Sequence, residues 1–384
     1  MDATGEFRVA LVHDWLTGMR GGEKCLEALC RRWPKASLYT LFHLRGQVSP
    51  AIENLGPRTT FLQKFPGVGR WYRHLLPLLP LAARWPIDAC DVVVSLSHCV
   101  AKAARPPAGV PHVCYCFTPM RYAWHMREAY FGASRLGRLK ARIADRLLGR
   151  LRDWDRRTAD RVTHFVAISR TVQERIRECY GRDSEVIYPP VDTDFYRPAD
   201  VRREDFYLVV SAFAPYKRVD LAIAACHRLK QELIVIGKGQ DAARLRALAG
   251  PTIHLLGWQP DEVIRDHYQR CRALLFPGEE DFGIVPVEAQ ACGCPVIAYG
   301  RGGATETVVS GQWSVVSGQP TGMWFEDQTE DCLIEAMQRF EGQEFEPAAA
   351  RRQATRFNAR RFEVEFEDYL NGVVGRRQDV AVVA

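Results

Sequence analysis

Short runs of apolar residues recur along the chain, and most are followed by a loop rich in glycine, proline or polar residues and then by an amphipathic segment. Continuous apolar runs of this length are typical of parallel strands that are buried on both faces. The segments after them carry apolar residues at helical spacing. This alternation of strands and helices predicts an α/β protein. We expect strands at residues 7–12, 37–42, 92–96, 112–116, 165–169, 206–212, 233–236, 253–256 and 273–276.

Two series of these elements are separated by a stretch that has neither a strand pattern nor a helix pattern. A chain of 384 residues is long for one core. The pair Pro189-Pro190 and the polar stretch through Asp205 are typical of a linker. We therefore expect domains at 1–190 and 206–345, a linker at 191–205, and a C-terminal helix with a tail at 346–384. The expected helices are 24–32, 170–180, 221–229, 331–340 and 348–370, with another that starts at Pro286.

The composition is that of a globular protein, with 47% hydrophobic and 26% charged residues. The net charge of +6 is mild and favours a basic patch over a general affinity for polyanions. We expect no nucleic-acid binding, because the arginines are not interleaved with stacking aromatic residues. The twelve cysteines include no CxxC pair, so we expect no zinc site. The N-terminus lacks the features of a signal peptide and no apolar stretch could span a bilayer, so we expect a cytoplasmic protein.

Two segments of the first domain combine basic and apolar residues, as segments that lie on membrane surfaces do. Residues 61–85 carry aromatic residues, leucines and prolines together with four basic residues from Lys64 to Arg84. This density of aromatic residues and prolines favours contact with a membrane or a lipid. Residues 135–161 place arginines on one side and leucines on the other, which suits either membrane contact or an ordinary helix with a solvated face. We expect peripheral binding to the inner face of the cell membrane.

The segment 274–308 carries the most distinctive chemical pattern. An apolar run ends at a Pro-Gly pair, and a second proline, Pro286, suits the first position of a helix, where a missing N–H costs nothing. The backbone amides of Gly283, Ile284 and Val285 then point out of the helix N-terminus, which is a natural anion site. Gly283 also lets an anion come close to the backbone.

Two carboxylates flank this expected anion site. Glu280 precedes the helix, and Glu288 follows eight residues later in its first turn. Neither lies on the apolar face of the helix, so we expect both outside the core. Carboxylates would repel a phosphate unless they face neutral hydroxyls, which they bind well. A phosphate flanked by sugar hydroxyls describes a nucleotide-sugar, whereas the plainer alternative for Glu288 is an acid that complements the helix dipole.

Glycine-rich and basic loops follow other predicted strands. Gly21 and Gly22 lie between the first strand and the first helix, where such a loop brings N–H groups to a phosphate or simply forms a turn. Lys217 and Arg218 follow the strand at 206–212 and precede a helix. Cations in this position suit a diphosphate leaving group.

The segment EEDFGIVPVEAQACGCPVIAYGRGGATE resembles the E-x7-E signature and the glycine-rich turn of retaining glycosyltransferases of family 4. The segment CYCFTPMRYAWH is similar to CYCHTPMRYAWD in the branch that includes O-antigen mannosyltransferases. The resemblance implies the GT-B fold, in which two doubly wound Rossmann-like domains face each other across a cleft. It assigns the acceptor to the N-terminal domain and the nucleotide-sugar to the C-terminal domain, with a C-terminal helix that crosses back to the N-terminal domain.

The resemblance also implies roles for single residues. Lys217, Arg218 and Glu280 would form the catalytic group, with the two cations on the leaving diphosphate and Glu280 on the hydroxyls of the sugar. Glu288 would hold the ribose, and Trp258 would lie at the edge of the nucleobase. The other residues expected to contact the donor are Gly21, Gly22, Gly257, Phe282, Gly283, Ile284 and Val285.

Strand ends in the first domain are expected to supply the acceptor or sugar side of the site. Family members often carry a histidine that contacts the donor sugar where this chain has Phe117, and an aspartate where it has His125. Many relatives also have an arginine in place of Ala212. His98 could replace the missing histidine or serve a structural role. The residues expected on this side are His98, Phe117, Thr118, Arg121 and Tyr122.

These expectations describe a retaining glycosyltransferase that moves a hexose, mannose from GDP-mannose, to a lipid-linked saccharide in surface polysaccharide synthesis. We expect neither a metal nor another cofactor. UDP-glucose and UDP-galactose stay open as donors. The alternatives are an epimerase or phosphorylase of the same fold, and a non-catalytic protein that binds sugar nucleotides at a membrane surface, which the Phe117 departure favours.

Overall fold

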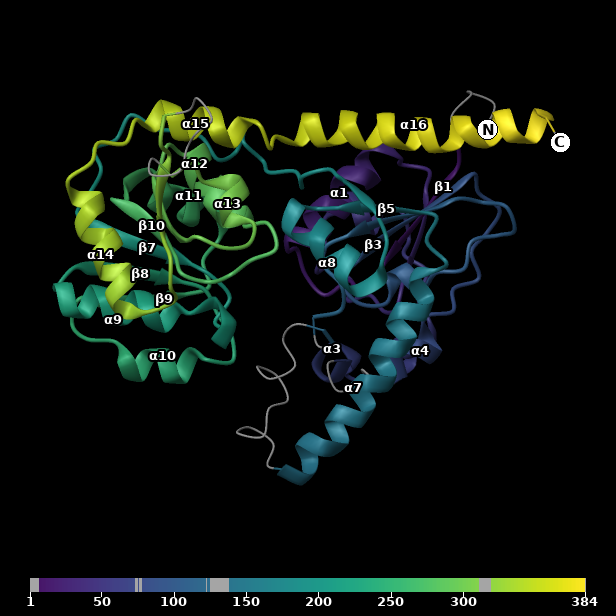
Figure 1. Ribbon diagram of the computed structural model, residues 1–384, viewed down its shortest axis with the longest axis horizontal. Coiled ribbons are helices and arrows are strands. Elements are labelled where there is room, and N and C mark those ends of the chain that lie inside the picture. Colours follow the sequence, from purple (N-terminus) through teal and green to yellow (C-terminus); the bar gives the residue numbers. More distant parts are fainter. Residues whose placement is uncertain are drawn as a thin grey trace. The chain divides into compact units, whose positions relative to one another are not determined.

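The computed structural model describes residues 7–72, 75, 78–121, 123–124, 138–310 and 319–383, without the side chains of residues 71, 138–145 and 377–383. The chain forms two compact units. Unit 1 comprises Met1–Pro190 and Phe362–Ala384, and unit 2 comprises Val191–Arg361 (Figure 1).

Unit 1 is built on a six-stranded sheet with the strand order β2-β1-β3-β4-β5-β6. All neighbouring strands pair in parallel. The chain passes from β1 to β2 and then returns to the other side of β1 for β3, which is the topology of a doubly wound fold. The strands are β1 Val9–His13, β2 Ser37–Thr40, β3 Val92–Ser97, β4 His112–Cys116, β5 His164–Ala167 and β6 Ser184–Val186.

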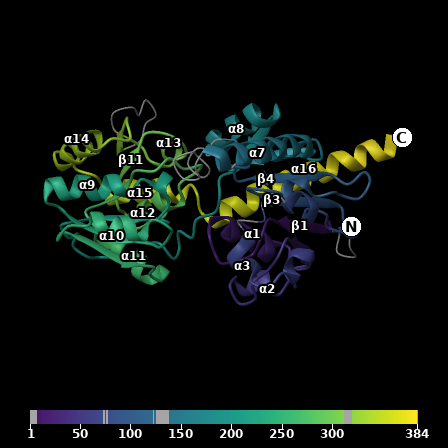
Figure 2. The same cartoon turned by 90° about the horizontal axis from the view of Figure 1, so that it is seen from below.

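The strands of unit 1 are buried by helices, and helix α16 lies beside α1 (Figures 1 and 2). Arg32 of α1 forms an ion pair with Glu367 of α16, with Nε 2.7 Å from Oε2. The ring centroid of Tyr115 in β4 lies 5.6 Å from that of Phe362 and 5.5 Å from that of Phe366. The helices are α1 Gly21–Arg32, α2 Pro50–Glu53, η1 Phe61–Lys64, α3 Val68–Trp71, α4 Leu79–Ala82, η3 Ala101–Ala103, α7 Arg138–Ala159, α8 Arg170–Tyr180 and α16 Ala359–Val383.

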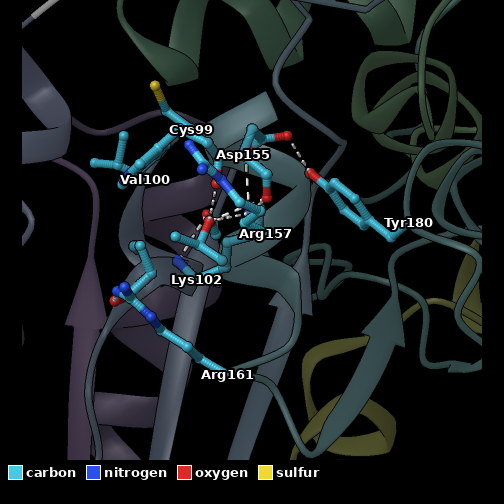
Figure 3. A network of polar contacts seen from close by, with 12 residues as sticks. Cys99, Val100, Lys102, Asp155, Arg157, Arg161 and Tyr180 are labelled. Atoms are coloured by element: carbon cyan, nitrogen blue, oxygen red, sulfur yellow. Dashed lines mark hydrogen bonds and ion pairs between the residues drawn. The ribbon is translucent and has the colours of Figure 1, made fainter. Parts of the chain in front are cut away.

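A buried polar network fastens α7 to unit 1. Lys102 of η3 and Asp155 of α7 are both buried, and Lys102 Nζ lies 3.1 Å from Asp155 Oδ1. Asp155 Oδ2 accepts hydrogen bonds from the Tyr180 hydroxyl at 2.8 Å and from the Trp124 indole at 2.9 Å. Figure 3 shows Lys102 and Tyr180 approaching Asp155 from different sides. Because each charge has a partner, the two charges can be buried together.

Unit 2 is built on a second six-stranded sheet, with the order β12-β11-β10-β7-β8-β9 and parallel pairing throughout. The chain passes outwards from β7 to β9 and then returns to the other side of β7 for β10, so this sheet is also doubly wound. The strands are β7 Phe206–Val210, β8 Glu232–Ile236, β9 Ile253–Gly257, β10 Ala273–Phe276, β11 Val296–Tyr299 and β12 Gly322–Phe325.

Helices cover both faces of the sheet in unit 2 (Figure 1). Helices α9, α10 and α14 lie on one face, and α11, α12 and α15 lie on the other. The helices are η4 Pro215–Lys217, α9 Val219–Leu229, α10 Ala242–Leu248, α11 Asp261–Arg270, α12 Ile284–Ala291, α13 Ala304–Thr307, α14 Glu330–Glu341 and α15 Pro347–Thr355.

The predicted α/β architecture with two Rossmann-like sheets is confirmed, and every predicted strand is present with ends shifted by a few residues at most. The sequence-based prediction lacks the strands β6, β11 and β12, the helices α10 and α11, and the short helices α2, α3, α4, α13, η1, η3 and η4. The helix predicted at 348–370 is wrong as a single element, because the chain breaks at 356–358 into α15 and α16. Asn358 Oδ1 accepts a hydrogen bond from the Arg361 backbone N–H at 2.8 Å and so caps a new helix.

The stretch expected to be a linker, residues 191–205, belongs to unit 2. Arg351 explains this packing, because its Nη1 donates to the carbonyl oxygens of Thr193 at 2.6 Å and Tyr196 at 2.7 Å. The carbonyl of Phe195 accepts a third bond, from Arg265, at 3.3 Å. The C-terminal segment predicted from 346 is divided, since the chain stays in unit 2 to Arg361 and joins unit 1 at Phe362.

Candidate functional site

The strand order of unit 2 places two loops at its topological switch point. Strand β7 lies between β8 and β10, so the loop after β7 and the loop after β10 leave the sheet side by side and turn to opposite faces. Ligands of doubly wound sheets bind in the crevice that such loops form at the carboxyl ends of the strands. Lys217 lies in η4, after β7, and Glu280 lies in the loop after β10.

Lys217 and Glu280 form an ion pair across the two loops, between Nζ and Oε1. Their side chains are 18% and 12% exposed, so the pair is reachable from solvent but mostly buried. The backbones of the two loops also approach each other closely. A Cβ on Gly278 would lie 3.0 Å from both Cα and the carbonyl oxygen of Lys217. Glycine at 278 therefore permits the contact that brings the two charges together.

Arg218 is turned to a different partner. Its Nε lies 3.4 Å from Asp220 Oδ1, and its Nη1 donates to the carbonyl oxygen of Gln328 at 3.3 Å. The backbone of Arg218 has φ of 50°, a left-handed conformation that costs a non-glycine residue about 1 kcal/mol. The structure thus brings Lys217 and Glu280 together and holds Arg218 in a separate pair.

Helix α12 begins at Ile284, two residues before the predicted start at Pro286. Gly283 is its N-cap residue, with φ of 86°, which favours glycine. Pro286 occupies the third helical position, where its missing N–H still costs nothing because the first four amides of a helix have no partner within it. The amides of Ile284 and Val285 are therefore the first two at this end of the helix.

The expectation that both signature carboxylates lie outside the core is wrong for Glu288. Its side chain lies in the second turn of α12 and is only 6% exposed. Glu288 Oε2 accepts a hydrogen bond from the Tyr268 hydroxyl of α11 at 3.4 Å. Burial is the main cause that raises the pKa of Tyr268, and the negative charge of Glu288 is the second. The raised pKa keeps the hydroxyl protonated, so it can donate a hydrogen bond.

Two glycines that the sequence analysis did not single out shape the loop around Glu280. The Gly303 N–H donates to the Glu280 carbonyl oxygen at 2.7 Å. A Cβ on Gly302 would lie 2.4 Å from that oxygen, and one on Gly303 would lie 2.3 Å from Phe282 Cα. The pair of glycines in the loop after β11 was the signal for this close approach. Phe282 itself is buried, with its ring centroid 5.4 Å from that of Phe357.

The residues expected to contact the nucleobase, Gly257 and Trp258, lie at the end of β9 and directly after it. Gly257 has φ of 73°, and its carbonyl oxygen accepts a hydrogen bond from the Gly237 N–H at 2.8 Å. Trp258 is 63% exposed. Lys238, in the loop after β8, places its Nζ 5.4 Å from the Trp258 ring centroid. An exposed indole beside a cation at the carboxyl edge of the sheet is a suitable surface for a flat ring.

In unit 1 the switch point lies between β1 and β3, where the polar residues after these strands meet. The buried carboxylate of Asp14, after β1, accepts hydrogen bonds from the backbone amides of His98, Cys99, Val100 and Ala101 at 2.6 to 3.0 Å. His98 Nδ1 lies 3.0 Å from Asp14 Oδ2. Burial raises the pKa of Asp14, but the charge and hydrogen bonds of His98 outweigh it and lower the pKa to about 2. His98 is thereby oriented by Asp14.

Gly22, Phe117 and His13 meet at the N-terminus of α1. A Cβ on Gly22 would lie 3.2 Å from Phe117 Cε2 and 3.5 Å from His13 Nε2, so glycine permits this packing. His13 is buried, and within the described residues neither ring nitrogen makes a hydrogen bond of normal geometry. Burial lowers the pKa of His13, which keeps the ring neutral. Sequence reasoning missed His13 and Asp14, and their place directly after the first buried strand was the signal.

The other residues expected near the acceptor are only partly described. Thr118 is buried, with its hydroxyl unpaired among the described residues. Arg121 is half-buried, whereas Tyr122 and His125 lie outside the described residues. Within the part of the chain that the structure describes, no three histidine, cysteine, aspartate or glutamate side chains are grouped as metal ligands would be. The absence of a metal requirement stays a prediction.

Both units match models of known families. Residues 192–361 match the family described as glycosyl transferases group 1. Residues 19–195 match the family described as glycosyltransferase family 4. The two matches meet at the boundary between the units, and together they span every strand of both sheets except β1.

Curated relatives share parts of the sequence. An uncharacterized glycosyltransferase of Methanocaldococcus jannaschii is 30% identical over 153 residues, which are 38% of this chain and 43% of that protein. The D-inositol 3-phosphate glycosyltransferase of Mycobacterium tuberculosis is 28% identical over 194 residues, which are 44% of this chain and 40% of that protein. The chain therefore matches less than half the length of these relatives.

Solved structures share the whole fold at low identity. The structure of HepE from Anabaena in complex with UDP superposes with a TM-score of 0.69 at 16% identity and covers 95% of this chain and 100% of that chain. WaaG, a glycosyltransferase involved in lipopolysaccharide biosynthesis, superposes with a TM-score of 0.58 at 17% identity and covers 92% of this chain and 95% of that chain.

Proposed function

Because both of its units match glycosyltransferase families, the chain belongs to the GT-B glycosyltransferases of the group 1 and family 4 type, and we propose that it is a retaining hexosyltransferase that uses a nucleoside diphosphate sugar. The observation that carries this proposal is the Lys217–Glu280 ion pair at the switch point of unit 2. Glu280 lies in the loop that connects β10 to α12. The pair places a cation and a carboxylate close to the N-terminus of α12. A diphosphate requires the cation and the helix amides, and sugar hydroxyls require the carboxylate.

In this proposal each group binds one part of the donor. The amides of Ile284 and Val285 and the ammonium of Lys217 hold the diphosphate and stabilise the negative charge that develops as it leaves. Glu280, released from part of its contact with Lys217, accepts hydrogen bonds from hydroxyls of the sugar. Glu288 holds the ribose, and Trp258 borders the nucleobase. Because these amides and the ammonium supply the positive charge, the reaction needs no metal ion.

The donor is the least constrained part of the proposal. GDP-mannose is our first choice, and it rests on the likeness of CYCFTPMRYAWH to the mannosyltransferase segment. A UDP-sugar is the second choice, supported by the HepE structures, which were solved with UDP and with UDP-glucose. Phe117 stands where family members often carry a histidine, and within unit 1 the ring centroids of His13 and His98 each lie 6.4 Å from that of Phe117, so either imidazole could take the place of the missing one.

A donor screen tests the proposal. Thermal unfolding should shift upwards with one nucleotide-sugar far more than with the others, because a ligand that binds only the folded state stabilises it. The same donor should then be consumed when saccharide acceptors are present. Glu288→Ala should weaken binding of the matching nucleotide about 10- to 100-fold, since hydrogen bonds to a charged group are lost. Isothermal titration with the free nucleotide measures this change.

Glu335→Ala is the matched control, because Glu335 is an exposed acid on α14 of the same unit. Its nucleotide affinity should equal that of the wild type. Equal affinity in Glu288→Ala would contradict the ribose role. Binding of a donor without any turnover would instead favour a non-catalytic sugar-nucleotide-binding protein.

We propose that the acceptor is a lipid-linked saccharide and that unit 1 reaches it at a membrane surface. In the segment 61–85 the side chains of Phe61, Phe65, Leu78 and Leu81 are 39 to 54% exposed, with basic residues between them. Amphipathic surfaces of this kind bind anionic bilayers. Helix α7 exposes arginines from Arg146 to Arg157 and suits either a bilayer or solvent. No helix among the described residues has the length and apolar character to cross a bilayer.

Replacing Leu78 and Leu81 together by aspartate should weaken binding to anionic vesicles at least about 10-fold, because both the apolar contact and the charge balance change. Co-sedimentation with phosphatidylcholine vesicles, with and without one third phosphatidylglycerol, measures the partition. Leu248→Asp is the control, because Leu248 is 48% exposed and lies in unit 2. Equal partition of the double variant and the control would remove the support for membrane contact through this segment.

A further inference from the structure

Unit 1 has a polar pocket that none of the roles above uses. It encloses about 600 Å³ and lies where the chain leaves β2. Its wall comes from three stretches: the turn after β2, helix α2 with the chain that follows it, and η1. A volume of this size is ordinary for a small-molecule site. The lining residues are His43, Arg45, Glu53, Gly56, Pro57, Thr59 and Gln63.

Hydrogen bonds hold the side chains of Glu53 and Gln63 in fixed directions on the wall of this pocket. Glu53 Oε1 accepts a hydrogen bond from the Gly46 N–H at 2.7 Å and lies 3.1 Å from His43 Nε2. Gln63 Oε1 accepts a hydrogen bond from the His43 N–H at 2.8 Å. These contacts use one oxygen of Glu53 and the amide oxygen of Gln63. They leave the second carboxylate oxygen and the amide NH₂ as an acceptor and a double donor on a preorganised wall.

The composition of the wall selects a neutral polyol. A carboxylate, an amide, a guanidinium and a hydroxyl line the pocket, so it offers both hydrogen-bond acceptors and donors. The negative charge of Glu53 offsets the positive charge of Arg45, so the carboxylate and the guanidinium together leave no excess positive charge that would select a phosphate or another anion. An apolar ligand would leave these polar groups buried without partners, which costs free energy for each of them. Sugar hydroxyls, which donate and accept, satisfy both kinds of group.

The pocket adjoins two features that a lipid-linked saccharide needs. On one side, the loop after β1 is bonded to the chain after β2, with the Leu16 N–H donating to the Phe42 carbonyl at 3.1 Å and the Leu44 N–H to the Leu16 carbonyl at 2.9 Å. This loop leads to Gly21 and Gly22 at the N-terminus of α1. On the other side, Phe61 of η1 and Phe65, directly after η1, are 47% and 44% exposed, with ring centroids 6.3 Å apart.

We infer that the pocket is a subsite for sugar residues of the acceptor saccharide that lie between its lipid anchor and its reacting hydroxyl. This inference rests on the proposed glycosyltransferase function. Adjacent strands are about 4.8 Å apart, so a saccharide in the pocket is one strand away from the switch point between β1 and β3. The exposed rings of Phe61 and Phe65 border the subsite towards the apolar anchor. The subsite therefore selects acceptors of more than one sugar residue.

Saturation-transfer NMR tests this subsite with three neutral probes: mannotriose, maltotriose and a galactotriose. The donor site is blocked with excess GDP and UDP, so that the signal reports contact elsewhere. At least one trisaccharide should receive saturation from the wild-type protein. Thr59→Trp, which fills the pocket from an exposed position, and Arg45→Ala should each reduce that signal at least about 5-fold.

Arg31→Ala is the matched control for Arg45→Ala, because Arg31 is exposed on α1 and does not line the pocket. Thermal unfolding of all variants should stay close to that of the wild type, since the three residues lie on the surface. The inference is wrong if no trisaccharide receives saturation, or if Thr59→Trp and Arg45→Ala leave the signal at the level of Arg31→Ala. Donor turnover by the wild type separates the two proposals: turnover without trisaccharide contact refutes the subsite alone, and contact without turnover refutes the transferase.

Discussion

Replacing Lys217 with alanine should lower kcat for sugar transfer about 100- to 1,000-fold and change the dissociation constant of the donor much less. The reason is that charge grows on the diphosphate only as the bond to the sugar breaks, so a cation fixed at that position stabilises the transition state more than the bound donor. Lys217 is fixed in this sense, because the loop after β7 holds it and Glu280 orients its ammonium group. Single-turnover kinetics at saturating donor measure the chemical step directly.

The Lys217→Ala variant also leaves Glu280 without its cation, and the free carboxylate would repel a diphosphate. The double variant Lys217→Ala/Glu280→Gln separates the two effects. Donor binding should recover in the double variant, whereas kcat should stay low. Arg246→Ala is the control for loss of a cation from unit 2, because Arg246 is exposed on α10. A Lys217→Ala protein that keeps the wild-type kcat would contradict the leaving-group role.

The Lys217–Glu280 pair also shows which part of the site could be read from the sequence. Both residues follow apolar runs, so their position at strand ends was predictable. Their contact was not, because it depends on the order of the strands. The loops after β7 and β10 are neighbours because β7, the first strand of unit 2 in the sequence, lies between β10 and β8 in the sheet. The glycines at 278, 302 and 303 indicate close backbone approaches, but the sequence could not show which loops approach each other, and the structure shows that these are the loops after β7, β10 and β11.

The burial of Glu288 could not be predicted for a different reason. Periodicity assigns faces only to a helix that has one polar side. Residues Pro286 to Ala291 of α12 are buried around the whole circumference, because the helix lies against the sheet with α11 and α15 beside it. A carboxylate in such a helix faces a neighbouring element, here Tyr268 of α11. Asp14 and His13 were missed, because polar residues at the end of a strand often belong only to the turn that follows it.

The buried network around Asp155 leads to the largest expected change in stability. Lys102 Nζ is 2.9 Å from the Thr158 hydroxyl and 4.9 Å from the ring centroid of Tyr180, in addition to its ion pair with Asp155. Removing one partner of a buried ion pair leaves an uncompensated charge. We therefore expect Asp155→Ala to lower the free energy of unfolding of unit 1 by about 3–5 kcal/mol. Urea unfolding followed by intrinsic fluorescence measures it, with Asp153→Ala, an exposed acid on the same helix, as the control near zero.

The double variant Lys102→Met/Asp155→Asn shows whether charge, rather than packing, causes this loss. Methionine fills the space of the lysine stem without a charge, and asparagine keeps an oxygen for the hydroxyl of Tyr180 and the indole of Trp124. If the unpaired charge dominates, the double variant should be more stable than Asp155→Ala, because replacing both members of a buried pair costs less than removing one. A loss in the double variant equal to the sum of the losses in Lys102→Met and Asp155→Asn would show instead that the two side chains act independently. In that case the side chains of the network would hold α7 by packing alone, and the pairing of the charges on Lys102 and Asp155 would add nothing to the free energy of unfolding.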